Sequence, residues 1–517
     1  MRREPFHSDT SQVTWVYVSF VLSLIVSLFA LLSPKQSSAQ ADGAPPKEVI
    51  YSLQELIESS LKSHPGVKAR RFEIEAAQRG LLAAKGMFDL QLNGDLDLMD
   101  DLVTIPNPLE MGARTPIGTQ RYSAELRLSQ PLRWGTILGF GLRQSQIETT
   151  NPFRNCVPGI ISDRCFESTL TLTLNQPLMR GRSAAANTSE EMNANVVIDG
   201  AKAQLRLELT RQVQAIAQFY VQLSLAQTQY HLEQEQLTLT ERRLQEAKER
   251  LKLGLVAESD LYPLEAALAQ REQGVMAALG RVEDVQAQLK ALSGLKVERV
   301  RFPQLWLEDD RLMALTPELT SAQLEANPQV SVLRATTQQL EVRREPLRDA
   351  ERSQLNLGLV WSQSGLGEAL GDALDALPNN ESRYYGVTLR YTQALSDRAE
   401  HQSAQLEAQL RASALDREAL LRDLRLQWER QVTQIHRNRR LLSLATAAQT
   451  ATARNHEAAS AKLNEGRATL FEVLELQNQS LASQTQRLAI EHEIAQALLE
   501  LWAINGELLD RFGLALQ

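Results

Sequence analysis

The residue types that most often carry chemistry are scattered along this chain instead of being gathered in one place. The seven histidines stand singly, and the acidic residues are spread through stretches that look helical. The sequence contains no glycine-rich phosphate loop, no nucleophile elbow and no group of metal ligands. Catalysis needs such residues at a spacing that lets them converge. We therefore expect no enzyme, no catalytic residues, no cofactor and no metal site.

One pair of acidic residues has a distinctive position. Glu472 and Glu475 follow a glycine turn at Gly466 and stand three residues apart. Side chains at that spacing share one face of a helix. From spacing alone they are ordinary exposed residues near the positive N-terminus of a helix.

The chain has two cysteines, Cys156 and Cys165. In an exported protein, such a close pair predicts a disulfide that holds one loop. Two free thiols are the alternative. A two-cysteine metal site would need further ligands, and no histidine lies near them.

Export is indicated by the first residues. Two arginines precede a long apolar run, and Ala39-Gln40-Ala41 supplies a cleavage site of small residues. This pattern predicts a signal peptide over residues 1–41. The apolar run is also long enough to be an uncleaved membrane anchor, which is the alternative.

The charge and composition exclude one class of partner and favour one class of structure. The net charge of −8 is mild, with acidic and basic residues interleaved. Nucleic-acid binding needs a concentrated basic surface, so we expect no nucleic-acid partner. Aromatic residues make up only 5% of the chain, which is typical of long helices packed by small and medium side chains.

Alternation of apolar and polar residues predicts six strands, each with one apolar and one polar face. They cover about residues 88–98, 121–130, 136–146 and 168–176 in the first half, and 353–362 and 383–393 in the second. A tight turn around Trp134-Gly135 contrasts with long polar loops at 99–119, 148–166 and 365–382. Short turns and long loops are typical of outer-membrane barrels. A soluble β-sandwich is the alternative, since its strands alternate in the same way.

The remaining sequence predicts long helices. From about Ala184 to Leu251 there is no proline, and later segments carry apolar residues every seven positions. Such heptads are typical of long helices packed side by side. Each predicted helical pair turns at a glycine, Gly254 in the first half and Gly466 in the second, because glycine takes the left-handed conformation that ends a helix.

The chain also contains one pattern twice. Two segments recur at a common offset, His64-Pro65-Gly66-Val67 as Asn327-Pro328-Gln329-Val330 and Gln91-Leu92-Asn93 as Gln354-Leu355-Asn356. A repeat indicates one structural unit used more than once to complete a shared surface. We divide the chain into a signal peptide (1–41), a first repeat (42–292), a linker (293–315), a second repeat (316–505) and a C-terminal tail (506–517).

Two sets of motifs now point to a family. The repeated opening runs from Leu56 to Val67 and again from Leu319 to Val330. The two turns read Gly254-Leu255-Val256-Ala257 with Ser259-Asp260-Leu261, and Gly466 with Glu472-Val473-Leu474. With these motifs, nearly all of the mature sequence resembles the TolC family of outer-membrane efflux proteins.

The resemblance implies an α+β membrane protein, a trimeric outer-membrane β-barrel continued by a long α-helical periplasmic barrel and built from two internal repeats. The homotrimer would be located in the cell outer membrane and extend into the periplasm. It would be the channel of a tripartite efflux or type I secretion system, with a periplasmic adaptor (membrane fusion protein) and an inner-membrane transporter as partners. The alternative is a periplasmic coiled-coil adaptor or scaffold, because adaptors also carry long heptad hairpins.

The resemblance also implies roles for residues at the glycine turns, which would form the closed tip of a tunnel. By position, Glu472 and Glu475 match acidic residues that ring the channel entrance. Three copies of each around a narrow axis would attract cations and repel anions. The alternative is the ordinary exposed pair described above.

A latch at the tip is a further implication. Asp260 matches a family residue that holds the tip closed, whereas Leu463 and Ala468 stand where a latch would need polar partners. Arg467 is the candidate substitute partner for Asp260. The strand count departs from the family too, because its subunits supply two strands per half and this first half has four. The additional hairpin around Trp134 would widen the barrel, lie outside it or fold into its lumen.

Overall fold

The computed structural model describes residues 51–106, 114–149, 155–157, 160–161, 164–254, 256–301, 303, 306, 315–379 and 382–514. The predicted signal peptide, residues 1–41, lies outside the described residues. Residues Ile50–Gln517 form one unit. No helix in the described ranges has both the length and the apolar character needed to cross a membrane.

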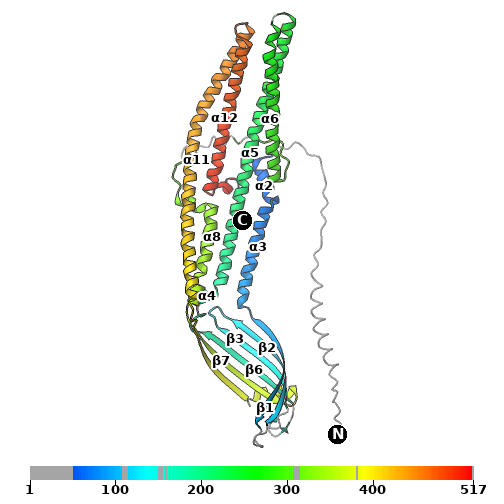
Figure 1. Ribbon diagram of the computed structural model, residues 1–517, viewed down its shortest axis with the longest axis vertical. Coiled ribbons are helices and arrows are strands. Elements are labelled where there is room, and N and C mark those ends of the chain that lie inside the picture. Colours follow the sequence, from blue (N-terminus) through cyan, green and yellow to red (C-terminus); the bar gives the residue numbers. More distant parts are fainter. Residues whose placement is uncertain are drawn as a thin grey trace, which may run out of the picture. The chain divides into compact units, whose positions relative to one another are not determined.

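Two helical hairpins dominate the described part of the chain (Figure 1). In the first, α5 (Ser189–Lys252) is followed by α6 (Tyr262–Ser293); in the second, α11 (Arg398–Asn464) is followed by α12 (Leu470–Ile504). Each pair packs along its length, and α5 also contacts α12. The 64 residues of α5 give it a length of about 100 Å, at a rise of about 1.5 Å per residue.

The long helix expected from Ala184 is interrupted near its start. A single turn, α4 (Ala184–Asn187), precedes α5, and Thr188 between them leaves the helical conformation. The side chain of Asn187 donates hydrogen bonds to the carbonyl oxygens of Gly181 (2.8 Å) and Arg133 (3.3 Å). This contact with the strand connections holds the short turn separately from the long helix.

Shorter helices lie beside the hairpins and share one local design. A proline begins both α3 (Pro65–Lys85), after α2 (Leu53–Ser63), and α8 (Pro328–Val342), after α7 (Ser321–Ala326). The residues before the two prolines, His64 and Asn327, take nearly the same extended conformation, with φ −61° and ψ 123° against φ −62° and ψ 130°. Proline forces that conformation on the residue before it. Two further short helices are α9 (Arg344–Ala350) and α13 (Leu508–Arg511).

Six strands of the described ranges form one antiparallel sheet in the order β1-β2-β3-β6-β7-β8. Their bounds are β1 Gln91–Pro106, β2 Arg114–Pro131, β3 Ile137–Thr149, β6 Arg164–Pro177, β7 Gln354–Gly367 and β8 Ser382–Thr392. The pairing of β6 with β7 therefore joins the strands of the first half to those of the second half in one sheet. The hairpin of β2 and β3 lies within the sheet, paired on both sides.

The long loop expected at 99–119 is mostly strand. β1 and β2 stay in register as far as the pair Pro106 and Arg114, and β-branched residues such as Val103 and Thr104 favour that extension. The other two expected loops contain small elements. The short strands β4 (Asn155–Val157) and β5 (Ile160–Ile161) fall in the first, and α10 (Leu370–Asp375) and η5 (Leu377–Asn379) in the second.

The main core lies where the hairpins meet the shorter helices. Fully buried side chains converge there from α2, α5, α11, α12 and α13, namely Leu56, Ile57, Ile216, Ile435, Leu498 and Leu508. Trp306 packs edge-on against Trp502, with ring centres 5.3 Å apart. Burying each of these large apolar side chains contributes about 1.5–3 kcal/mol, so this cluster fixes how the two hairpins stand beside each other.

Candidate functional site

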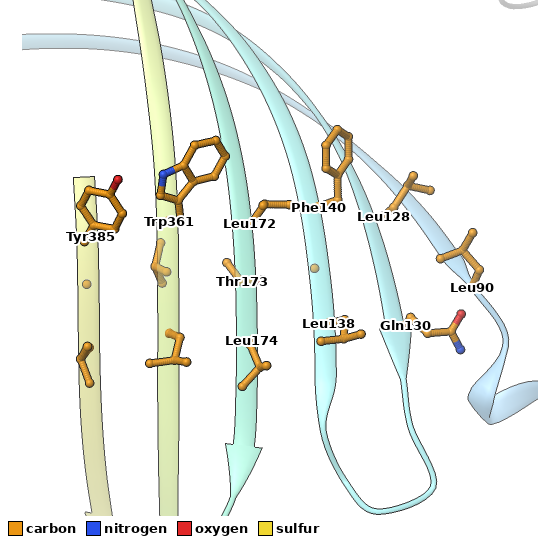
Figure 2. A pocket seen from close by; sticks show the side chains of 15 residues that line it. Leu90, Leu128, Gln130, Leu138, Phe140, Leu172, Thr173, Leu174, Trp361 and Tyr385 are labelled. Atoms are coloured by element: carbon orange, nitrogen blue, oxygen red, sulfur yellow. The ribbon is translucent and has the colours of Figure 1, made fainter. Parts of the chain in front are cut away.

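One face of the sheet is apolar and exposed (Figure 2). A row of directly paired residues crosses five strands, Leu128, Phe140, Leu172, Trp361 and Tyr385. At the sheet edges the exposure is high, 84% for Leu96 and 76% for Val387. A continuous apolar surface of this kind marks a site of contact with a membrane or another protein.

The opposite face is polar and holds a buried carboxylate. Glu125 on β2 is 7% exposed. Arg127 Nε donates to its Oε1 at 3.0 Å, and Arg143 Nε donates to its Oε2 at 2.9 Å. Gly141 leaves room for this group, since a Cβ there would lie 3.3 Å from Oε1. Threonine and serine side chains continue the polar surface across β6 and β7. The sheet thus separates an apolar side from a hydrophilic one.

Both helical hairpins turn at the expected glycines. Gly254 has φ +72° and Gly466 has φ +75°, a conformation that glycine adopts without steric cost. Their amides donate to the carbonyl oxygens of Leu251 (2.9 Å) and Leu463 (3.0 Å). These bonds satisfy carbonyls that would otherwise be left free at the helix ends.

The two acidic residues after the second turn lie side by side on the surface. Thr469 caps α12 by accepting a hydrogen bond from the amide of Glu472 at 3.2 Å. Glu472 and Glu475 are exposed, on the side of α12 away from the buried Val473 and Gln477. Glu475 Oε1 accepts a hydrogen bond from Gln479 at 3.1 Å. Both carboxylates are therefore accessible to solvent.

Asp260 and Arg467 have local partners within the subunit. Asp260 Oδ2 accepts a hydrogen bond from the amide of Ala257 at 3.1 Å and so caps the short helix η2 (Glu258–Asp260). Arg467 pairs with Glu465, at 3.1 Å. Asp260 does line one pocket with Leu463, between the two turns. The structure thus places Asp260 near Leu463, the apolar residue at the expected latch position. It does not pair Asp260 with Arg467, because each of them has another partner.

A polar contact that sequence reasoning missed joins the two hairpins below their turns. Arg243 on α5 donates to Gln477 Oε1 on α12, and its Nη2 lies 3.1 Å from His456 Nε2 on α11. Gln477 is buried and also donates to Gln236. Burial, together with the neighbouring Arg243, lowers the pKa of His456. Arg271 on α6 makes a second link, to Asn478 on α12.

Of the two cysteines in the predicted disulfide, the structure describes the side chain of Cys165 only. Cys165 on β6 is disulfide-bonded and buried against Ile147 on β3. The side chain of Cys156 lies outside the described side chains, so its pairing with Cys165 stays a prediction. Among the described residues no group of three or more histidine, cysteine, aspartate or glutamate side chains converges as a metal site would.

Solved structures share this arrangement. No protein-family model and no curated protein sequence matches the chain. The outer-membrane protein VceC of Vibrio cholerae aligns with a TM-score of 0.60 and 14% identity, over 88% of this chain and 96% of its own. The outer-membrane channel CmeC of Campylobacter jejuni aligns with a TM-score of 0.60 and 12% identity, over 92% and 94%. The open state of the MtrE outer-membrane channel of Neisseria gonorrhoeae aligns with a TM-score of 0.58 and 13% identity, over 88% and 89%.

The chain has the fold of outer-membrane channels. The resemblance inferred from the repeated opening and the glycine turns is confirmed at the level of the fold. CmeC and MtrE are outer-membrane channels and VceC is an outer-membrane protein, and this chain spans nearly the whole length of each.

Proposed function

We propose that this protein is the outer-membrane channel of an export system, located in the outer membrane and extending into the periplasm. The observation that carries the proposal is the two-faced sheet joined to long helical hairpins, in a fold shared with outer-membrane channels. The exposed apolar face suits the lipid side of a membrane, and the polar face with Glu125 suits a water-filled lumen.

The finer part of the proposal concerns assembly. Three copies, each built from two repeats, form one barrel and one helical tunnel. The two hairpin turns of each copy, at Gly254 and Gly466, lie at the tunnel tip, away from the sheet (Figure 1). A periplasmic adaptor and an inner-membrane transporter deliver the substrate there, as part of a tripartite efflux or type I secretion system. In this proposal conduction through the channel is passive, and the inner-membrane transporter supplies the driving force.

Glu472 and Glu475 are proposed as the entrance ring. Their exposure on one side of α12, immediately after the turn, supports this role. Carboxylates gathered around a narrow axis raise the local concentration of cations.

The test is planar-bilayer conductance of the purified trimer under a salt gradient. We expect cation selectivity that falls at least severalfold in the double variant Glu472→Gln/Glu475→Gln, with the trimer intact. Glu429→Gln, an exposed carboxylate on α11 away from the turns, is the matched control and leaves the selectivity unchanged.

Two results would count against the proposal. Equal selectivity in the double variant and the wild type would contradict the proposed entrance ring but not the proposed channel. If the protein is found in soluble or inner-membrane fractions and shows no conductance, the channel proposal is contradicted and an adaptor or scaffold is favoured.

A further inference from the structure

The polar face of the sheet is hollowed over its middle strands. This polar hollow has a volume of about 550 Å³ and is lined by residues of β2, β3, β6 and β7. Small-ligand sites have volumes of about 300–1,000 Å³. Two rows of directly paired residues cross the hollow, Arg127, Gly141, Thr171 and Ser362 in one and Glu125, Arg143, Thr169 and Ser364 in the other. Arginines therefore lie on one side, on the additional hairpin of β2 and β3, and hydroxyl groups lie on the other.

Glu125 holds two of the arginines in place and leaves most of their donors free. Arg127 and Arg143 each donate to it twice, through Nε and Nη2. A guanidinium group has five N–H donors, so the other donors of each arginine are available to a ligand. The two side chains are 51% and 47% exposed. Because these groups are already fixed in position, binding a ligand to them costs less entropy.

The polar hollow has a net positive charge. Three arginines and two glutamates line it, namely Arg121, Arg127, Arg143, Glu125 and Glu167. Glu125 is enclosed by its two arginines, so its charge is compensated within the sheet. Asp95 and Asp97 lie beside Glu125 and Ser123 on the edge strand β1, outside the lining of the hollow. An anionic group is therefore attracted to the hollow and not to the edge strand next to it.

The other side of the hollow offers hydroxyl groups. The oxygens of Thr169 and Ser364 lie 2.8 Å apart and form a hydrogen bond. Within the described ranges, the hydroxyl groups of Thr171, Thr173 and Ser362 have no hydrogen-bond partner in the chain. A hydroxyl group both donates and accepts hydrogen bonds. This side of the hollow therefore suits a ligand that also does both, as the hydroxyl groups of a sugar do.

A sugar that carries a carboxylate would use both sides of the hollow. A simple carboxylate would pair with the arginines and leave the hydroxyl groups of β6 and β7 unused. A neutral sugar would use the hydroxyl groups and leave the positive charge unmatched. We propose that the polar hollow binds an acidic carbohydrate, with its carboxylate against Arg127 and Arg143 and its sugar hydroxyls against β6 and β7.

The proposal rests on the proposed channel only for the route by which the ligand arrives. In that channel the polar face lines the lumen, and the ring of Glu472 and Glu475 at the other end repels anions. The acidic carbohydrate therefore reaches the hollow from the barrel side.

Calorimetric titration of the purified full-length protein, in a detergent without a sugar headgroup, tests the site. The probes are trigalacturonate, the neutral maltotriose and acetate. We expect trigalacturonate to bind about tenfold or more tightly than either of the other two, because it alone has both carboxylates and hydroxyl groups. This measurement does not depend on conductance.

Three variants assign the binding to the two sides of the hollow. Glu125→Gln/Arg127→Gln/Arg143→Gln removes the charges of the cluster together, so no buried carboxylate is left unpaired, and should weaken trigalacturonate binding about tenfold. Thr171→Val/Thr173→Val keeps every charge and should weaken it severalfold. Arg383→Gln is the matched control and should bind normally, because the register places Arg383 on the opposite face of the sheet.

The outcomes separate the site from the channel. Equal affinity for trigalacturonate and maltotriose overturns the role of the arginines, and equal affinity for trigalacturonate and acetate overturns the carbohydrate assignment. Absence of trigalacturonate binding to a protein that conducts ions overturns the site and leaves the channel proposal standing. Binding that the triple variant loses, in a protein that shows no conductance, supports the site and contradicts the channel.

Planar bilayers test the route of access. Trigalacturonate added on the barrel side should reduce the current through the wild-type channel, and the same concentration on the tip side should reduce it less. Equal block from the two sides contradicts the proposed route.

Discussion

Polar side chains buried between the hairpins decide how the two helical pairs face each other. Gln477 binds Arg243 and Gln236 at once, so its amide is satisfied only when α12 stands in one position along α5. An unpaired polar group in such a place costs about 1–3 kcal/mol. The contact therefore specifies a register that the apolar side chains around it, such as Leu244, would leave open.

His456 makes this contact sensitive to pH. Its pKa is lowered in the folded protein, by burial first and by Arg243 second, while Glu246 is the acidic group that acts on Arg243. Between the lowered pKa and the ordinary value near 6.5, the unfolded chain binds more protons than the folded one. Stability contributed by neutral His456 is thus complete above about pH 6.5 and is lost as the pH falls through that window. We expect the melting temperature to drop between pH 7.5 and 5.5.

The variant His456→Gln checks the source of that drop. Glutamine keeps an acceptor for Arg243 but does not titrate, so the variant should lose part of the pH dependence of the melting temperature. His401→Gln, an exposed residue on α11, should keep the full dependence. His492, whose pKa burial also lowers, acts in the same direction, whereas Glu491 and Glu500, whose pKa burial raises, oppose it. Identical pH profiles in wild type and His456→Gln would show that the Arg243 contact is not the sensor.

At the scale of elements, glycine serves two different purposes. Gly254 and Gly466 provide left-handed turns in open space, with no atom within 4 Å of the position of a Cβ. Gly135, in the turn between β2 and β3, has φ +85°, and a Cβ there would collide with the carbonyl oxygen of Gly181. The left-handed backbone conformation alone requires glycine at Gly254 and Gly466, whereas conformation and close packing together require it at Gly135.

Alanine substitutions should separate these purposes. Gly254→Ala carries only the conformational cost, about 1–2 kcal/mol, and should leave trimer yield nearly unchanged. Gly135→Ala also forces the turn away from Gly181 and Asn187, so we expect a loss of several kcal/mol and little folded trimer. Heat-modifiability on gels, with the unfolding midpoint in urea, measures both. Equal effects of the two substitutions would show that the close approach between Gly135 and Gly181 does not contribute to stability.

The elements were largely predictable because their signals are local. Alternation located the strands and glycine located both hairpin turns, since both patterns reflect the backbone of the segment that carries them. The extension of β1 and β2 into the expected loop at 99–119 depends on cross-strand pairing, which no single segment reveals. The partners of Asp260 and Arg467, and the link from Arg243 to Gln477, depend on tertiary packing. One available signal was missed, namely that Gln236 and Arg243 stand seven residues apart in a helix with heptad packing.

At the scale of the whole molecule, the sheet and the hairpins answer different physical demands. The sheet has one exposed apolar face and one polar face around Glu125, as the wall of the proposed channel would need. The hairpins instead pack against each other through contacts that include polar ones, such as Arg243 with Gln477. The two regions meet at the turn of β2 and β3, where Arg133 pairs with Glu191 on α5 at 3.1 Å. That turn ties the additional hairpin to the helices as well as to the sheet.

The six strands per subunit predict the width of the lumen. With strands about 4.8 Å apart and tilted by about 40°, an eighteen-stranded barrel has a backbone radius of about 18 Å, against about 12 Å for twelve strands. Exclusion of polymers of graded size, added on the barrel side of a planar bilayer, measures that radius. A deletion that joins Pro106 to Arg164, with Cys165→Ser, removes β2 and β3 but keeps β1 antiparallel to β6. We expect its polymer cut-off to fall toward that of the narrower barrel. A wild-type cut-off already matching twelve strands would place β2 and β3 outside the wall, whether or not the deletion variant folds.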